Sequence, residues 1–128
     1  RSVVISGDSN VTDNTLKIVN GADLLLHDAL SLPTTTALSK ALGAVGLSRQ
    51  ATIVSDVQDY HASAQSLVEL GKKSDVAMVA FYHLVPVPPN ALLADIFLRG
   101  APDNFLLTED LMWFEFPVNS DEIIINRP

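Results

Sequence analysis

Three short apolar runs constrain the fold of this chain more than any other feature of its sequence. They cover residues 3–6, 22–26 and 76–82, and the surrounding sequence reads VVISGD, ADLLLHD and DVAMVAFYH. Apolar runs without alternation are typical of strands that are covered on both faces of a sheet. Patterns typical of helices lie between the runs, so the sequence predicts an α/β fold.

The remaining segments predict helices and a closing hairpin. Apolar periodicity and stop signals predict helices over residues 10–20, 34–44, 48–59 and 91–98, and a further helix that opens at His61. The tail has period-two stretches and an Asn-Ser turn signal, which indicate two antiparallel strands. Its aromatic residues, Trp113, Phe114 and Phe116, are expected in the core.

Composition excludes several classes of function. A chain of 128 residues with 48% hydrophobic content forms one domain, or part of one. The net charge of -7 argues against nucleic-acid binding through many electrostatic contacts to backbone phosphates. The absence of cysteine excludes disulfides, thiolate zinc sites and a cysteine nucleophile. No apolar run approaches the roughly 20 residues of a membrane span. We expect a soluble protein, with the compartment left open between cytoplasm and periplasm.

Histidine and aspartate residues mark the ends of the apolar runs. Asp8 follows the first run and His83 the third, while His27 and Asp28 end the second. The carboxyl ends of parallel strands gather at one edge of a sheet, which is where functional groups collect. A single residue of this kind is usually structural, but together they predict a site. Imidazole and carboxylate without thiolate suit zinc, manganese or iron.

A carboxylate can bridge two metal ions, and Asp8 is the candidate bridge. Two ions about 3.5 to 4 Å apart can stabilise both the attacking and the leaving oxygen of a hydrolysis. Such a centre needs more protein ligands than this chain offers. We therefore expect that the chain supplies only part of the site.

Four segments, in order along the chain, resemble the metallo-β-lactamase superfamily of metal-dependent hydrolases, in the branch of RNase Z and arylsulfatase-like proteins. The segment ISGDS resembles the family's Ser-Gly-Asp-Thr motif, and GADLLLHDA resembles its Gly-Ala-Asp-Leu-Leu-x-His-Glu-Ala segment. Residues 59–90 resemble the stretch with a helix-opening histidine, a strand and a metal-binding histidine. Residues 108–123 are similar to the closing hairpin.

The resemblance implies roles for individual residues. Asp8 would bridge two divalent ions, with zinc expected and manganese or iron as alternatives, and His83 would bind one of them. Asp28 and His61 would form a proton-handling catalytic pair near the leaving group. Asp28 stands where the family usually has glutamate, which is one methylene longer. His27 has no ligand role in the family pattern.

The family's His-x-His-x-Asp-His motif is absent from this chain. Residues 1–128 therefore resemble the second half of an αββα sandwich, with a mixed sheet, helices on the outer face and a closing antiparallel hairpin. The implied partner is the missing amino-terminal half of the same domain, which would cover an otherwise exposed sheet face. Because a half-sandwich would expose an apolar sheet face that needs a partner, we expect a fragment rather than a chain cut at the half boundary or a separate subunit. Whether the chain forms a homo-oligomer is left open.

The leading hypothesis is part of a metal-dependent hydrolase in which a metal-bridged hydroxide attacks an ester-like bond: a phosphodiester, sulfate ester, carboxylic ester or lactam. The chain alone would be inactive. The acidic charge favours a small substrate over RNA. One alternative is a non-catalytic assembly or regulatory subunit that kept the fold and lost its ligands. A third is a flavodoxin-like binding domain, against which the lack of a glycine-rich phosphate loop counts.

Overall fold

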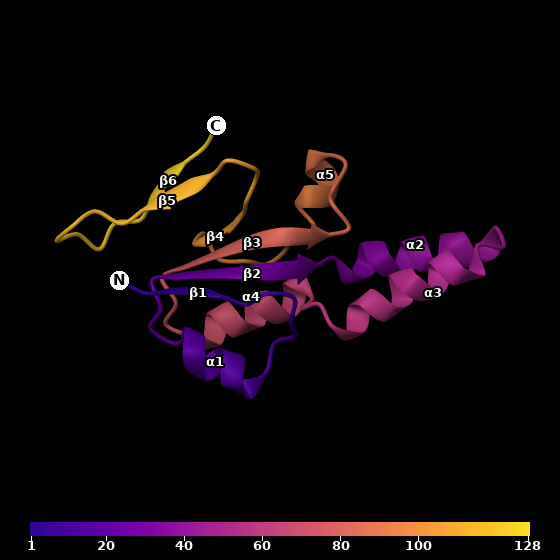
Figure 1. Cartoon of the computed structure of the whole chain (residues 1–128), viewed down its shortest axis with the longest axis horizontal. Coiled ribbons are helices and arrows are strands. Elements are labelled where there is room, and N and C mark those ends of the chain that lie inside the picture. Colours follow the sequence, from indigo (N-terminus) through magenta and orange to yellow (C-terminus); the bar gives the residue numbers. More distant parts are fainter.

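The computed structural model describes all residues, 1–128, as a parallel sheet with helices and a separate hairpin (Figure 1). The elements in chain order are β1 (Val3–Ile5), α1 (Asp13–Val19), β2 (Leu24–Leu30), α2 (Leu32–Ala44), α3 (Ser48–Asp56), a 3-10 turn (Val57–Asp59), α4 (Ala64–Lys73), β3 (Met78–Val85), α5 (Ala91–Ala94), β4 (Phe105–Leu107), β5 (Trp113–Glu115) and β6 (Ile124–Asn126).

The main sheet has the strand order β1-β2-β3-β4, and every pair in it is parallel. This confirms the predicted α/β class. The prediction of one mixed sheet is wrong, because β5 and β6 pair only with each other and form a second, antiparallel sheet. The predicted closing hairpin is confirmed. The fourth parallel strand, β4, was not predicted, since its three residues carry too short a pattern to detect.

Several elements differ from their predicted bounds. Strand β2 continues through His27 and Asp28 to Leu30, and β3 continues past His83 to Val85. Polar side chains do not end β2 because they are hydrogen-bonded to one another within the fold. The helix predicted over 91–98 ends at Ala94, and α3 gives way to the 3-10 turn before residue 60.

One face of the main sheet carries the core. Helices α1 and α4 lie against it (Figure 1), and α4 buries Leu67 and Val68 completely. Gly71 lets α4 approach closely, because a Cβ there would lie 2.3 Å from the Phe105 ring. The core on this face joins α1, α4 and the strands into one unit.

The opposite face is partly open at β1. Val3 and Ile5 are 47% and 66% exposed, so the prediction that the first strand is covered on both faces is wrong. β1 is an edge strand with a helix layer on one side only.

The predicted burial of the aromatic stripe is also wrong for its largest member. Trp113 is 51% exposed, and its indole N–H donates to Glu115 on the same strand. Phe114 and Phe116 are half-buried. The hairpin does not join the main sheet, so its aromatic residues are not enclosed between sheet and helices as core residues are.

Helices α2 and α3 form an arm that projects beyond the carboxyl end of β2 (Figure 1). They pack on each other, and the Ser39 hydroxyl donates to the Ala51 carbonyl across their contact. None of the helices of this chain has both the length and the apolar character that crossing a membrane requires.

Candidate metal and proton-transfer site

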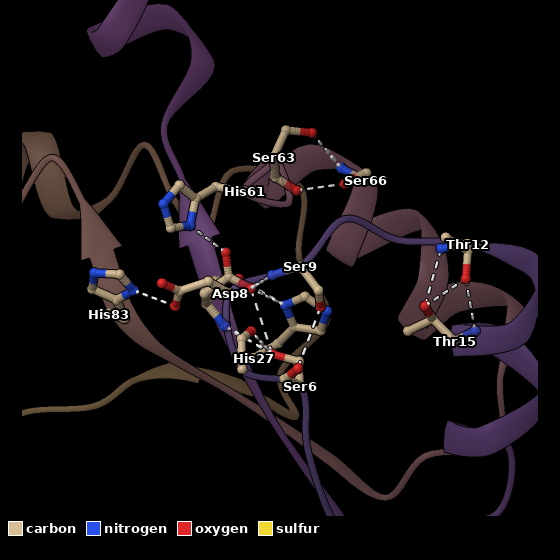
Figure 2. A network of polar contacts seen from close by, with 12 residues as sticks. Ser6, Asp8, Ser9, Thr12, Thr15, His27, His61, Ser63, Ser66 and His83 are labelled. Carbon is tan, nitrogen blue, oxygen red and sulfur yellow. Dashed lines mark hydrogen bonds and ion pairs between the residues drawn. The ribbon is translucent and has the colours of Figure 1, made fainter. Parts of the chain in front are cut away.

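The structure brings four of the predicted polar residues together near the carboxyl ends of β1, β2 and β3 (Figure 2). Asp8 lies in the loop after β1, just behind Gly7, whose φ of +63° turns the chain out of the strand. Asp28 and His83 lie within β2 and β3. His61 does not open a helix as predicted; it precedes α4, whose N-cap is Ser63.

Asp28 and His61 form a buried pair, which we call the inner pair. The His61 Nδ1–H donates to Asp28 Oδ2 over 2.7 Å. Asp28 is completely buried and His61 is 5% exposed. The aspartate is thus long enough to reach the imidazole, although it is one methylene shorter than glutamate.

The second oxygen of Asp28 is also occupied. His27 Nδ1 lies 2.8 Å from Asp28 Oδ1. The backbone N–H of Ser9 donates to the same oxygen over 3.3 Å, and the Ser6 hydroxyl lies 3.5 Å away. Ser6 and Ser9 were not predicted, and the only signal for them is that they flank Asp8 in the motif ISGDS.

The pKa of Asp28 lies below its usual value. Burial disfavours the charged carboxylate and pushes the pKa upward, but the hydrogen bonds from His27 and His61 outweigh burial. Asp28 is therefore ionised at neutral pH. An ionised carboxylate only accepts hydrogen bonds, which places a proton on the Nδ1 atom of each histidine that faces it.

Asp8 and His83 form a second pair, which we call the outer pair. His83 Nδ1 lies 2.9 Å from Asp8 Oδ1, and both side chains are about half exposed, at 47% for His83 and 56% for Asp8. The outer pair therefore has the same composition as the inner pair and a different environment.

A β-bulge sets the position of His83. Asp28 pairs with Tyr82 and Ala29 pairs with Leu84, so His83 is an extra residue in β3 with no partner on β2. It has a φ of 44°, which is uncommon for a residue other than glycine. Bulges near functional sites redirect a side chain out of the sheet, and this one turns His83 toward Asp8 (Figure 2).

The two pairs meet at a small cluster of donor atoms. Asp8, His61 and His83 each offer one ligand atom, and these atoms lie within 4.8 Å of one another. The His61 and His83 rings are 5.2 Å apart, edge to face. Because Nδ1 of His61 is held by Asp28, its Nε2 is the nitrogen free to act at the cluster. Asp8 and His83 are an exposed carboxylate and imidazole of the kind that first-row divalent ions bind, and His61 lies beside them.

His27 takes a different position from the other predicted residues. It lies within β2 rather than after it, and its side chain is completely buried. Its Nε2 atom has no hydrogen-bond partner. His27 thus contacts the cluster only through Asp28.

No protein-family model matches this chain, and no curated protein matches it.

Proposed function

We propose that this chain is the carboxyl-terminal half of a metallo-β-lactamase-type, metal-dependent hydrolase that cleaves an ester-like bond. The observation that carries the proposal is the junction of the two pairs: Asp8 and His83 lie exposed at the sheet edge, beside an imidazole whose far nitrogen is held by a buried carboxylate. Such an arrangement provides metal donors and a positioned proton carrier in one place.

Asp8 and His83 would hold the metal. They are exposed, they are not tied to the core, and carboxylate and imidazole are ligands for zinc, manganese and iron. When bound, a divalent ion supplies Lewis-acid activation of water and of the scissile bond. Asp8 and His83 are too few ligands for two ions, so a dinuclear centre would take its other ligands from the proposed amino-terminal half.

His61 would move the proton. Its Nδ1–H stays directed at Asp28 Oδ2, while its Nε2 would take a proton from the attacking water and pass it to the leaving group. The Asp28 carboxylate fixes the tautomer of the ring and stabilises the charged imidazolium. Carboxylates that hydrogen-bond to the second nitrogen of a catalytic histidine act in this way. Removal of Asp28 would leave the ring free to rotate and to change tautomer.

The charge of the chain favours a small ester, sulfate ester, phosphodiester or lactam over RNA. With a net charge of -7 and eight Lys and Arg residues in total, the chain has little to attract a long polyanion. A small substrate needs only contacts at the site itself.

A non-catalytic assembly or regulatory subunit is the second candidate. It is favoured by the open face of β1, where Val3 and Ile5 expose apolar surface to a partner. This candidate predicts that Asp8 and His83 bind no metal.

Paramagnetic Mn²⁺ tests the metal site directly, because it broadens nearby amide signals in NMR spectra even at low occupancy. We expect substoichiometric Mn²⁺ to broaden the signals around Asp8 and His83, and Zn²⁺ to reverse the effect by competition. Asp8→Asn should abolish the broadening, and Asp103→Asn, at an exposed acid outside the site, should not. Broadening that persists in Asp8→Asn would refute the metal site.

Hydrolysis needs a separate assay. The chain, expressed together with the amino-terminal half that the proposal requires, is tested on p-nitrophenyl esters, p-nitrophenyl sulfate and bis(p-nitrophenyl) phosphate. We expect turnover of at least one substrate, with loss of turnover in Asp8→Asn and in His83→Ala. Metal binding without turnover of any of them would reject the hydrolase and retain the metal site.

A further inference from the structure

The buried carboxylate of Asp28 is shared by two imidazoles, and both approach it through Nδ1. The Nδ1 atom of His61 hydrogen-bonds to Oδ2 over 2.7 Å, and the Nδ1 atom of His27 lies 2.8 Å from Oδ1. The proposed function uses Asp28 and His61 and assigns nothing to His27. Yet His27 is one of three histidines in the chain and is completely buried, so its polar ring needs a physical explanation.

The environment of His27 selects one form of its ring. Two oxygen atoms of Asp28 lie near the Nδ1 atom of His27. The backbone carbonyl oxygen is 2.9 Å away and the carboxylate oxygen Oδ1 is 2.8 Å away. The Nε2 atom is buried without a partner. A proton on Nε2 would be a buried donor without an acceptor, and it would also leave the bare Nδ1 lone pair facing two oxygen acceptors. His27 therefore carries its single proton on Nδ1.

A neutral donor of this kind restricts Asp28 without cancelling its charge. His27 and the Ser9 N–H occupy Oδ1, so the plane of the carboxylate is fixed and Oδ2 is directed at His61. A lysine or arginine in the same place would compete with His61 for the negative charge. The neutral His27 ring leaves that charge to His61 alone.

We propose that His27 is a positioning residue: through Nδ1 it locks the Asp28 carboxylate, and through Asp28 it holds His61 in the tautomer that presents Nε2 to Asp8 and His83. The catalytic meaning of this lock rests on the proposed function. The lock itself is a property of three buried side chains and is measurable without metal or substrate.

Two substitutions separate the hydrogen bond from the packing of the ring. In His27→Asn, the side-chain amide nitrogen is bonded to Cγ, as Nδ1 is in histidine, so a donor to Asp28 is kept. In His27→Phe, a ring fills the space and the donor is lost. His83→Ala is the matched control, because His83 contacts Asp8 and has no hydrogen bond to Asp28.

Long-range ¹H–¹⁵N correlation spectra of the ¹⁵N-labelled, metal-free chain report which ring nitrogen carries the proton. We expect His27 and His61 to be Nδ1–H tautomers in the unmodified chain, and His61 to remain so in His27→Asn and His83→Ala. In His27→Phe, the single Nδ1–H pattern of His61 should be lost and replaced by a mixture with Nε2–H.

Two results would overturn the proposal. One is an Nε2–H tautomer for His27 in the unmodified chain, and the other is an unchanged His61 pattern in a folded His27→Phe chain. If His27→Phe does not fold, as judged by circular dichroism, the spectra of the unmodified chain and of His27→Asn decide, since loss of the His61 pattern in His27→Asn also contradicts the lock. The Mn²⁺ and hydrolysis experiments test the proposed function independently of these signals.

Discussion

The inner pair, Asp28–His61, and the outer pair, Asp8–His83, are chemically alike and physically different. In each, a histidine Nδ1 lies within 3 Å of an aspartate oxygen, at 2.7 Å and 2.9 Å. The inner pair is almost fully buried, whereas both side chains of the outer pair are about half exposed. Burial, and not the identity of the residues, therefore separates their roles.

Burial makes the inner pair rigid and the outer pair adaptable. Around Asp28, each oxygen already has a donor, so neither is free to bind a metal ion. At Asp8, the second oxygen has no protein partner, and the contact with His83 is exchangeable with solvent. The inner pair is suited to hold a proton in place, and the outer pair to accept a ligand.

Removal of the inner carboxylate has the largest expected effect on stability. Asp28→Asn places an amide N–H against one of two imidazole N–H groups in a buried site, so we expect the free energy of unfolding to fall by about 3 kcal/mol. Asp8→Asn should change it by less than about 1 kcal/mol, as for other exposed pairs. Urea denaturation measures both, and equal losses would abolish the distinction between the pairs.

Zinc should stabilise the chain through the outer pair only. At a Zn²⁺ concentration of about 100 times the dissociation constant, binding to the folded state adds about 2.7 kcal/mol to the free energy of unfolding. We expect this gain to disappear in Asp8→Asn and in His83→Ala and to persist in Asp103→Asn. A gain that survives in all three variants would locate zinc elsewhere.

Acid should act on the inner pair. The pKa of Asp28 is lower in the folded chain than its usual value of 3.8, because the hydrogen bonds from His27 and His61 outweigh the opposing effect of burial. The contribution of the ionised Asp28 carboxylate to the free energy of unfolding is complete above the pKa that Asp28 has in the unfolded chain. It is lost as the pH falls through the pKa of Asp28 in the folded chain. Stability measured from pH 6 to pH 2 should therefore fall more steeply in the unmodified chain than in Asp28→Asn. If stability falls with pH equally steeply in both chains, the hydrogen bonds to the Asp28 carboxylate do not stabilise the fold.

The smallest expected effect on the free energy of unfolding concerns the backbone conformation of His83. With a φ of 44°, the position tolerates asparagine better than a β-branched residue. We expect His83→Val to be about 1 kcal/mol less stable than His83→Asn in urea denaturation. If the two variants are equally stable, the bulge in β3 relaxes and does not by itself hold His83 in place.

The sequence predicted which helices and strands are present better than it predicted the residues at which they begin and end. Unalternating apolar runs predicted three of the four parallel strands. Burial of consecutive residues explains the pattern in β2 and β3, whereas β1 carries the same pattern although Val3 and Ile5 are exposed. Residues such as His27 read as the end of a strand, since a sequence does not reveal that a buried polar ring finds its acceptor on the next residue. The aromatic stripe failed for a related reason: whether Trp113 is covered depends on where the hairpin packs, and that is not a local property.

For the candidate site, the sequence predicted Asp8, Asp28, His61 and His83, and the structure adds which of these side chains lie together. The pairing of His61 with Asp28 depends on a contact across 33 positions of the chain. The orientation of His83 depends on a one-residue bulge that residue types do not encode in a recognisable way. The serines that complete the surroundings of Asp28 are too common in loops to be singled out.

In the proposed function, the outer pair binds the metal while the inner pair keeps its proton. Isothermal titration of the chain with Zn²⁺, compared between His83→Ala and His61→Ala, tests it most directly. We expect His83→Ala to lower the affinity for Zn²⁺ by about tenfold or more, and His61→Ala to leave it unchanged. An equal loss in both variants would contradict it, because His61 would then be a metal ligand and not the proton carrier.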